Sequence, residues 1–266
     1  MVTELKYSNT NTYLIKGEDG YLLFDTGWAG TFPMFCKALG ELHVAAQDIK
    51  YIIISHFHPD HMGIAQNIAN LGATIVVLDV QQDYIHAADV IFEKDHKVEF
   101  LSIQEAAVLM VPIAESRDFL GKIGVQGEVM HTPGHSEDSI SLVLDQGMVF
   151  VGDLNPLYEL ELHKGTVIDE SWQHILAHNP AKVYYGHAKT ADLHELVLEA
   201  NSVEQKELYT LVKQIMKYID KGKPLAWIQG KTGANAEFVE DVARMYLTHQ
   251  NVGVQGILDR IEIKGK

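Results

Sequence analysis

Residues 55–61 read SHFHPDH and place three histidines and one aspartate within six positions, namely His56, His58, Asp60 and His61. Neutral imidazole and carboxylate groups are ligands that zinc and related divalent cations bind well. A catalytic zinc ion takes about three protein ligands and keeps one position open. Because this segment alone exceeds that number, and more ligand-type residues follow downstream, the sequence indicates a site for two ions.

Three further ligand-type residues follow along the chain, which are His135 in TPGH, Asp153 in GD and His187 in GH. Each comes just after a strand-like run and next to a glycine. Loops at strand ends can turn several side chains toward one point, whereas a regular strand alternates its faces. Coincidence is the competing explanation, but the pattern in residues 56–61 alone is expected by chance in roughly one such chain in several hundred. We therefore expect one metal centre.

Short apolar runs bounded by turns predict the strands that must position these residues. A hairpin is expected where the runs 12–16 and 21–24 flank the turn at 17–20. A helix over 63–69 between two apolar runs predicts a strand–helix–strand order. The other ranges predicted as strands are 51–54, 73–78, 128–131, 139–144, 148–151 and 183–185.

The pattern becomes helical from about Asp192, with apolar residues at helical spacing from Leu208 to Met216. Residues 81–92 also predict a helix, whereas residues 100–121 have no clean period and receive no assignment. The spacing of apolar residues changes to a helical period near residue 200, and this change predicts two domains. These are a catalytic domain over 1–201 and a mostly helical extension over 202–266.

Charge is unevenly spread along the chain and restricts the partners. The net charge is −15, but residues 202–266 hold ten basic and eight acidic residues, so residues 1–201 carry −17. Nucleic-acid binding depends on Lys and Arg contacts with phosphates, so this surface argues against a nucleic-acid partner and for a small-molecule substrate. No apolar run reaches about 18 residues, so we expect no membrane partner. A homodimer through the helical extension is left open.

The N-terminal residues lack the basic and apolar regions of a secretory signal, and the chain has one cysteine, Cys36. A single cysteine excludes an internal disulfide and fits a reducing compartment, so we expect a cytoplasmic protein. Because Cys36 lies among apolar residues in the range 32–39, we expect a buried thiol with no part in catalysis.

The motifs HFHPDH, TPGH, GD and GH occur in this order, with DTG before them at residues 25–27. Together they resemble the metallo-β-lactamase superfamily over roughly residues 10–190. The resemblance implies an α/β fold, a four-layer αβ/βα sandwich with the metals at one edge. In this chain a C-terminal helical extension would follow it.

By match to the family motifs, the seven ligand-type residues form two sets with one shared member. The set for one ion is His56, His58 and His135. The set for the second ion is Asp60, His61 and His187. Asp153 would bridge both ions, and Asp25 would orient ligands without being one itself.

The bridging aspartate narrows the implied function, since true zinc β-lactamases commonly lack it. The full set is similar to glyoxalase II, lactonases and phosphodiesterases. We therefore expect a hydrolase with two divalent ions, zinc first and manganese or iron as alternatives. A bridging hydroxide would attack an ester-type carbonyl (lactone or thioester), with Asp60 as the catalytic residue that orients it. The alternatives are a phosphodiesterase or ribonuclease of the superfamily, and a mononuclear iron sulfur dioxygenase.

Overall fold

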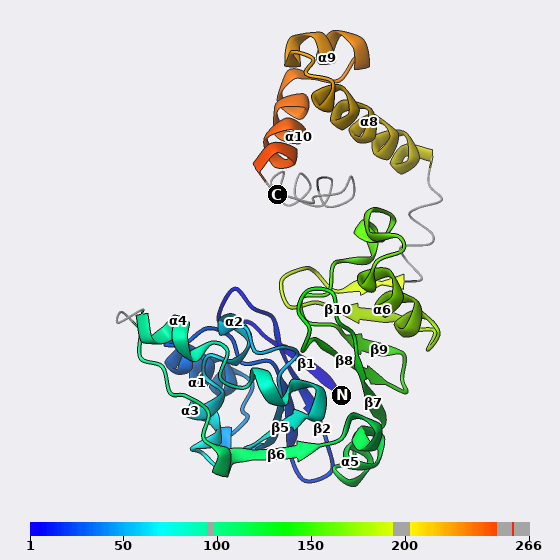
Figure 1. The fold of residues 1–266 in the computed structure, drawn as a ribbon. Helices are drawn as coiled ribbons and strands as arrows, with labels where there is room; N and C mark the ends of the chain where they lie inside the picture. Colours follow the sequence, from blue (N-terminus) through cyan, green and yellow to red (C-terminus); the bar gives the residue numbers. More distant parts are fainter. Residues whose placement is uncertain (95–97, 194–202, 249–256, 258–266) are drawn as a thin grey trace. The chain divides into compact units, whose positions relative to one another are not determined.

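The computed structural model describes residues 1–94, 98–193, 203–248 and 257 (Figure 1). By compactness these residues form two units. The first unit comprises Met1–Leu154 and Glu170–Ala191, and the second comprises the described parts of Asn155–Asp169 and Asp192–Lys266. The predicted boundary at residue 201 lies outside the described residues and stays a prediction.

Two β-sheets form the centre of the first unit (Figure 1). The six-stranded sheet contains, in spatial order, β1 (Val2–Leu5), β2 (Thr12–Lys16), β3 (Tyr21–Phe24), β4 (Ile49–Ile53), β5 (Thr74–Leu78) and β6 (Val108–Val111). Strands β1 to β3 pair antiparallel, and β3 to β6 pair parallel. The five-stranded sheet has the order β11 (Ala191–Asp192), β10 (Lys182–Tyr184), β9 (Met148–Phe150), β8 (Ile140–Leu144) and β7 (Gly127–His131).

The core lies on both faces of the first sheet, because successive residues of a strand point to opposite sides. In β5, Val76 belongs to the cluster shared with β8 and β9 of the other sheet, whereas Ile75 and Val77 pack beneath helices. Those helices include α1 (Phe32–Glu41) and α3 (Ala65–Ala69). Burial on both faces explains why these strands read as continuous apolar runs in the sequence.

The second sheet has a helix on its outer side, which completes four layers. Helix α6 (Val167–Leu176) buries Trp172 and Ile175, and the Trp172 ring lies 6.4 Å from the ring of Tyr185, just after β10. The other described helices of this unit are α2 (Pro59–Met62), α4 (Asp89–Lys94) and α5 (Ser116–Lys122). Short 3₁₀ turns of the first unit are η1 (Ala46–Asp48), η2 (Asp79–Tyr84), η3 (Glu105–Ala107) and η4 (Ile113–Glu115), whereas η5 (Leu157–His163) belongs to the second unit. The predicted sandwich is confirmed.

The helices of the first unit depart from the prediction in two places. The helix expected over 63–69 begins only at Ala65, as α3, and a separate short helix, α2, precedes it. The two helices are interrupted at Gly63, whose N–H donates to the Gly27 carbonyl (2.9 Å). The helix predicted over 81–92 is wrong, since the segment forms η2, turns and only then α4. Buried Gln81 holds η2 by accepting a hydrogen bond from the Leu78 N–H (3.3 Å). The unassigned range 100–121 contains β6 and most of α5.

The expectation of a buried Cys36 is also wrong, because this side chain is exposed on α1. Phe35 and Leu39 fill the inward face of the helix, and Cys36 lies about 100° further round the helix axis than Phe35.

Among the described residues of the second unit, three long segments form α-helices, namely α8 (Val203–Asp220), α9 (Leu225–Thr232) and α10 (Ala236–Thr248). They share a core that includes Val212, Ile215 and Val242. The helix predicted through Leu208–Met216 is confirmed, whereas helical residues expected near 196–198 lie outside the described ranges. Within those ranges no helix has the length and apolar character needed to cross a membrane. The cytoplasmic location stays a prediction.

Candidate metal centre

All seven proposed ligands lie in segments that follow the carboxyl ends of strands, five of them on loops and two, Asp60 and His61, in the short helix α2. β7 and β9 both pair antiparallel with β8, and β9 pairs parallel with β10, so β7, β9 and β10 run in one direction. His135, Asp153 and His187 come from the loops after these three strands, and residues 56–61 follow β4. The two sheets therefore bring four loops to one edge, as the sequence predicted.

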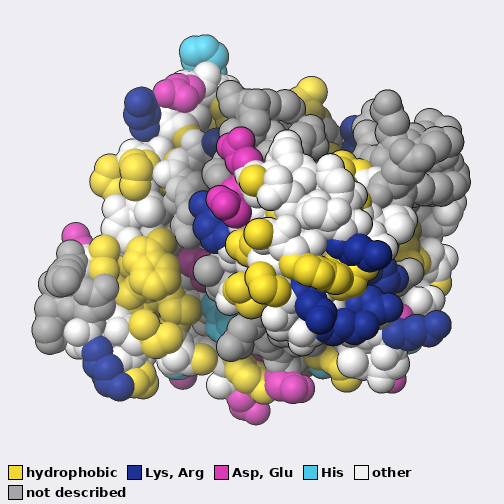
Figure 2. Space-filling model, turned by 90° about the horizontal axis from the view of Figure 1, so that it is seen from above, with side chains coloured by type: hydrophobic (Ala, Val, Ile, Leu, Met, Phe, Trp, Pro, Cys, Tyr) yellow, Lys and Arg dark blue, Asp and Glu magenta, His cyan; other side chains and the backbone are white. Residues whose placement is uncertain are grey.

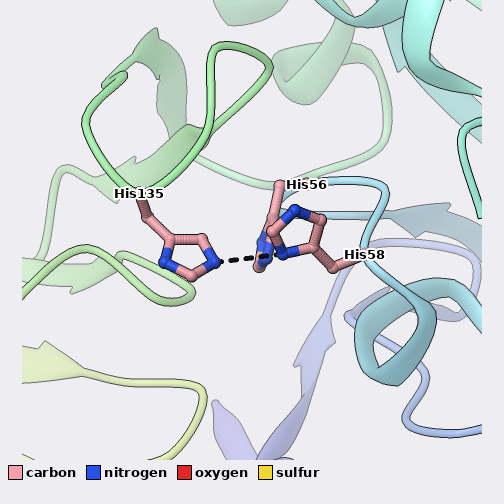
Figure 3. Close-up of side chains that lie close together, drawn as sticks. All are labelled: His56, His58 and His135. Carbon is pink, nitrogen blue, oxygen red and sulfur yellow. Dashed lines mark hydrogen bonds between the residues drawn. The ribbon is translucent and has the colours of Figure 1, made fainter.

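His56, His58 and His135 form one group, which we call the first triad. One ring nitrogen from each lies within 4.8 Å of the others. Nε2 of His135 is 3.1 Å from Nδ1 of His58, and Figure 3 shows the three rings turned toward one another from two separate loops. The ring of His56 is buried, whereas the other two reach solvent.

Asp60, His61 and His187 form another group, which we call the second triad. Nε2 of His187 lies 2.9 Å from Oδ2 of Asp60, and Nε2 of His61 lies 3.9 Å from the same oxygen. His61 is fully buried, and the Asp60 side chain is about one quarter exposed (24%).

Asp153 lies between the two triads. Its Oδ1 is 3.3 Å from Nε2 of His61, and its Oδ2 is 3.7 Å from Nε2 of His135 and 3.5 Å from Nε2 of His187. One carboxylate thus faces members of both triads. Asp153 also groups with His56 and His61, with their ligand atoms within 4.8 Å of one another.

Three buried polar atoms at this edge fit a bound cation. Within the described part of the chain, Nε2 of His56, Nε2 of His61 and Oδ1 of Asp153 have no hydrogen-bond partner. Each such atom costs about 1–3 kcal/mol unless something binds it. Two nitrogens and a carboxylate oxygen that share one space are a donor set that divalent zinc accepts.

Glycines keep this space open. A Cβ at Gly186 would lie 2.5 Å from Oδ1 of Asp153 and 2.8 Å from Cε1 of His61, so any side chain there would enter the centre. Gly152 has a positive φ of 56°, and a Cβ there would lie 2.5 Å from the Ser55 side chain. Glycine is therefore required in the GD and GH motifs, because neighbouring atoms come too close to leave room for a side chain.

Asp25 has the orienting contacts that the family resemblance implied. Its Oδ2 lies 2.9 Å from Nδ1 of His61, and its Oδ1 accepts the Ser55 N–H at 2.7 Å. The Ser55 hydroxyl donates to Asp25 Oδ2 (2.9 Å) and lies 3.0 Å from Nδ1 of His56. This network directs the Nε2 atoms of both histidines toward Asp153.

Two buried positioning residues were not predicted from the sequence. Asp138 accepts the backbone N–H of Phe57 at 2.7 Å, which joins the loop of His135 to the loop of residues 56–61. Gln81 donates through Nε2 to the carbonyls of Ile54 (2.9 Å) and Asp138 (3.2 Å). Only the position of Asp138, three residues after the motif histidine, could have drawn attention to it.

The charges of the centre suit cation binding. Burial alone would raise the pKa of Asp60 and of Asp153, but the neighbouring imidazoles of His187 and His61, respectively, lower both pKa values to about 2. Burial and the neighbouring His61 lower the pKa of His56 well below its usual value. Burial opposes a charge on His61 as well, yet Asp25 and Asp153 raise its pKa to about 10. The ionised carboxylates and the neutral His56 are thus available at neutral pH, whereas His61 has to release a proton when a cation binds.

Two aromatic residues next to the sequence motifs pack inward rather than toward the centre. Phe57 is buried in the core, and Trp28 packs its ring against Phe92 at 5.4 Å. Outside the motifs, His43, His86 and His178 are exposed, whereas the histidines at positions 96, 194 and 249 lie outside the described residues. His131 lies 2.7 Å from the Glu137 carbonyl.

A family model described as the metallo-beta-lactamase superfamily matches residues 6–187 of the chain. The chain belongs to the metallo-beta-lactamase superfamily. The family resemblance read from the motifs is thereby confirmed.

Several curated proteins are similar to this member of the superfamily. A beta-lactamase-like protein 2 homolog of Drosophila melanogaster is 27% identical over 191 residues, covering 69% of this chain and 60% of the relative. A relative in Methanocaldococcus jannaschii, named a probable metallo-hydrolase, is 26% identical, and the aligned part covers 53% of this chain and 65% of the relative. An atrochrysone carboxyl ACP thioesterase of Aspergillus chevalieri is 27% identical, and the aligned part covers 54% of this chain and 39% of that protein. The chain spans 51–60% of the length of the first three relatives.

Solved metallo-beta-lactamases share the fold. A metallo-beta-lactamase from Cronobacter sakazakii superposes with a TM-score of 0.52 and 16% identity, covering 69% of this chain and 76% of that one. A subclass B3 enzyme from a soil metagenome library gives a TM-score of 0.53 and 19% identity, with 70% and 76% covered. At these identities the likeness concerns the fold alone.

Proposed function

We propose that this superfamily member is a dinuclear metal-dependent hydrolase of ester-type carbonyl compounds, with a thioester as the favoured substrate and a lactone as the other. The observation that carries the proposal is the position of Asp153, whose carboxylate faces both triads within 3.7 Å. Four separate loops contribute to this arrangement, and three of its buried polar atoms lack a protein partner.

Each triad would hold one divalent ion in this proposal. The first ion would be bound by His56, His58 and His135, and the second by Asp60, His61 and His187. Asp153 would bind both. Zinc is favoured by the histidine-rich donor set, and manganese and iron accept the same donors.

The bound ions would supply a nucleophile, by lowering the pKa of water toward neutrality, and would polarise the substrate carbonyl. Asp60 is the residue that would orient the attacking water and accept its proton on the carboxylate. Its side chain is partly exposed, whereas the neighbouring His61 is fully buried. Hydrolysis of a thioester forms the acyl C–O bond, breaks the C–S bond and returns the proton to the leaving thiolate.

Two observations support a thioester over a polyanionic substrate. One relative bears the name of an acyl-carrier-protein (ACP) thioesterase, and its aligned part covers 54% of this chain. In addition, residues 1–201 carry a net charge of −17, which disfavours a long nucleic acid at the catalytic unit.

A substrate panel on protein of measured metal content tests the proposal. Lactones, acyl thioesters and phosphodiesters would be compared at equal enzyme concentration, with metal analysis of the same sample. We expect two ions per chain and the highest kcat/KM on a thioester or lactone. A preference for phosphodiesters, or a single iron with oxygen consumption on a persulfide, would contradict the proposal and favour the phosphodiesterase or the dioxygenase.

A further inference from the structure

Five lysines lie within 19 positions of the sequence, on or between helices of the second unit. Residues 213–231 contain five lysines and a single acidic residue, Asp220, in a chain whose net charge is −15. All five are exposed, and they lie at the end of α8, in the turn after it and on α9. They are Lys213, Lys217, Lys221, Lys223 and Lys231.

None of these lysines has a carboxylate partner within the described part of the chain. Asp220, the one acidic residue among them, accepts a hydrogen bond from the Tyr246 hydroxyl at 2.8 Å. Lys213, Lys217 and Lys221 follow one another at intervals of four, which places them on one side of the helix and its end. Like charges at this spacing repel one another, so the local structure alone does not favour the arrangement.

An exposed aromatic ring lies among these charges. Trp227 is 44% exposed and its neighbour Leu225 is 40% exposed. The Lys223 ammonium lies 5.3 Å from the centre of the Trp227 ring, and the Tyr218 ring meets Trp227 at 5.1 Å with an interplanar angle of 86°. Figure 2, seen from the side on which α9 lies in Figure 1, shows Lys and Arg side chains gathered next to hydrophobic ones. We call the five lysines with Leu225 and Trp227 the lysine face.

The composition of the lysine face fits an acidic protein best. Protein interfaces combine a small apolar centre, often with Trp, and a polar rim, and complementary charge selects the partner. A long nucleic acid would need phosphate contacts well beyond five lysines, on a protein that is otherwise acidic. A membrane surface would find only two exposed large apolar residues on α9 to insert.

We propose that the lysine face docks a small acidic protein that carries an acyl group as a thioester. The proposal rests on the thioesterase activity proposed above, and it names the form in which the substrate arrives. Docking on the second unit would lower the KM for a carrier-bound acyl group. It would leave the chemical step at the metal centre unchanged.

A charge-reversal pair tests the docking. The variant Lys217→Glu/Lys221→Glu changes two exposed residues of the lysine face. The matched control Lys50→Glu/Lys122→Glu makes the same change in charge at two exposed lysines of the first unit. Binding of an acidic acyl carrier protein to the full-length chain would be measured by titration at low ionic strength. We expect a Kd raised about tenfold or more in the first variant and within about twofold of the wild type in the control.

Kinetics separate docking from catalysis. An acyl group on the carrier protein would be compared with the same group on N-acetylcysteamine. We expect the lysine-face variant to raise KM for the carrier-bound substrate only, with kcat unchanged, and an increase in salt to reproduce this effect in the wild type. Hydrolysis of the small thioester should be the same in all three proteins.

Three outcomes would overturn the docking proposal. These are equal carrier binding by the wild type and the lysine-face variant, tighter binding of a single-stranded oligonucleotide than of the carrier, and tighter binding of anionic phosphatidylglycerol vesicles. If the wild type hydrolyses no thioester at all, the proposed function fails instead. The binding titration still reports on the docking in that case, because it needs no turnover.

Discussion

The two triads of the metal centre are positioned in different ways. In the second triad, the ring nitrogens that face away from Asp153 are fixed by hydrogen bonds. Nδ1 of His61 lies 2.9 Å from the Asp25 carboxylate, and Nδ1 of His187 donates to the Asn9 carbonyl at 3.0 Å. Such partners determine both the tautomer and the orientation of an imidazole.

In the first triad, the backbone rather than the exposed rings is fixed. His58 and His135 contact each other at 3.1 Å, and within the described residues no carboxylate or carbonyl accepts a hydrogen bond from the other nitrogen of either ring. Their loops are joined instead by the bond from Phe57 N–H to buried Asp138. In the second triad, hydrogen bonds therefore fix the orientation of the histidine rings. In the first triad, a hydrogen bond fixes the loops, whereas the rings of His58 and His135 are freer to turn. We expect a chelator to remove an ion from the first triad before the second.

Replacement of Asp153 should have the largest effect, because its carboxylate faces both triads. We expect Asp153→Ala to abolish hydrolysis and to remove at least one ion per chain, since neither triad keeps the shared oxygen ligand. Metal analysis after gel filtration, together with the thioester assay, measures both effects. Retention of two ions at wild-type affinity would show that Asp153 does not bridge.

Asp25→Asn should weaken the second triad more than the first, because Asp25 contacts His61 directly and His56 only through Ser55. Asparagine tolerates the positive φ of 62° at this position and can still accept the Ser55 N–H, but its amide cannot orient His61 as a carboxylate does. We expect a loss of about 10–100-fold in affinity for one of two ions, the usual effect of removing such a partner. Competition with a chromophoric chelator resolves the two binding steps. An equal loss of affinity in both metal-binding steps would contradict the proposed difference between the triads.

Asp138→Ala should weaken the first triad by a smaller factor. The change removes the acceptor of the Phe57 N–H, and freer loops should lower the affinity for the first ion by about tenfold. Asp138→Asn is the matched control, because its carbonyl oxygen can still accept this bond. A cobalt-substituted protein reports the change through its visible spectrum. If the two variants bind cobalt alike, this hydrogen bond does not position the first triad.

Cys36→Ser should have the smallest effect. The thiol is exposed on α1, and none of the groups of ligand-type residues at the centre includes it. We expect unchanged metal content and kcat/KM, and a change in unfolding free energy within about 0.5 kcal/mol. A folded variant that loses an ion would show that the assignment of ligands is wrong.

Much of this molecule could be predicted because its signals are local in the sequence. Strands β2 to β5 and β7 to β10 appear as apolar runs, since most are buried on both faces, whereas β1, β6 and β11 were not predicted. The range 81–92 was misread because Gln81 turns inward to bond the Ile54 and Asp138 carbonyls, and these lie on other loops. The exposure of Cys36 was missed because apolar neighbours do not show which side of a helix faces the core.

The sequence by itself determined which residues are candidate metal ligands, since three histidines and an aspartate in residues 56–61 already exceed the needs of one ion. Only the tertiary structure decided how they are grouped. His58 stands in an extended conformation just before α2 (φ −76°, ψ 153°), whereas Asp60 and His61 lie within that helix, where each residue turns about 100° from the last. Neighbours in the chain therefore point to different triads, and each triad is completed by a histidine from the other sheet, at position 135 or 187.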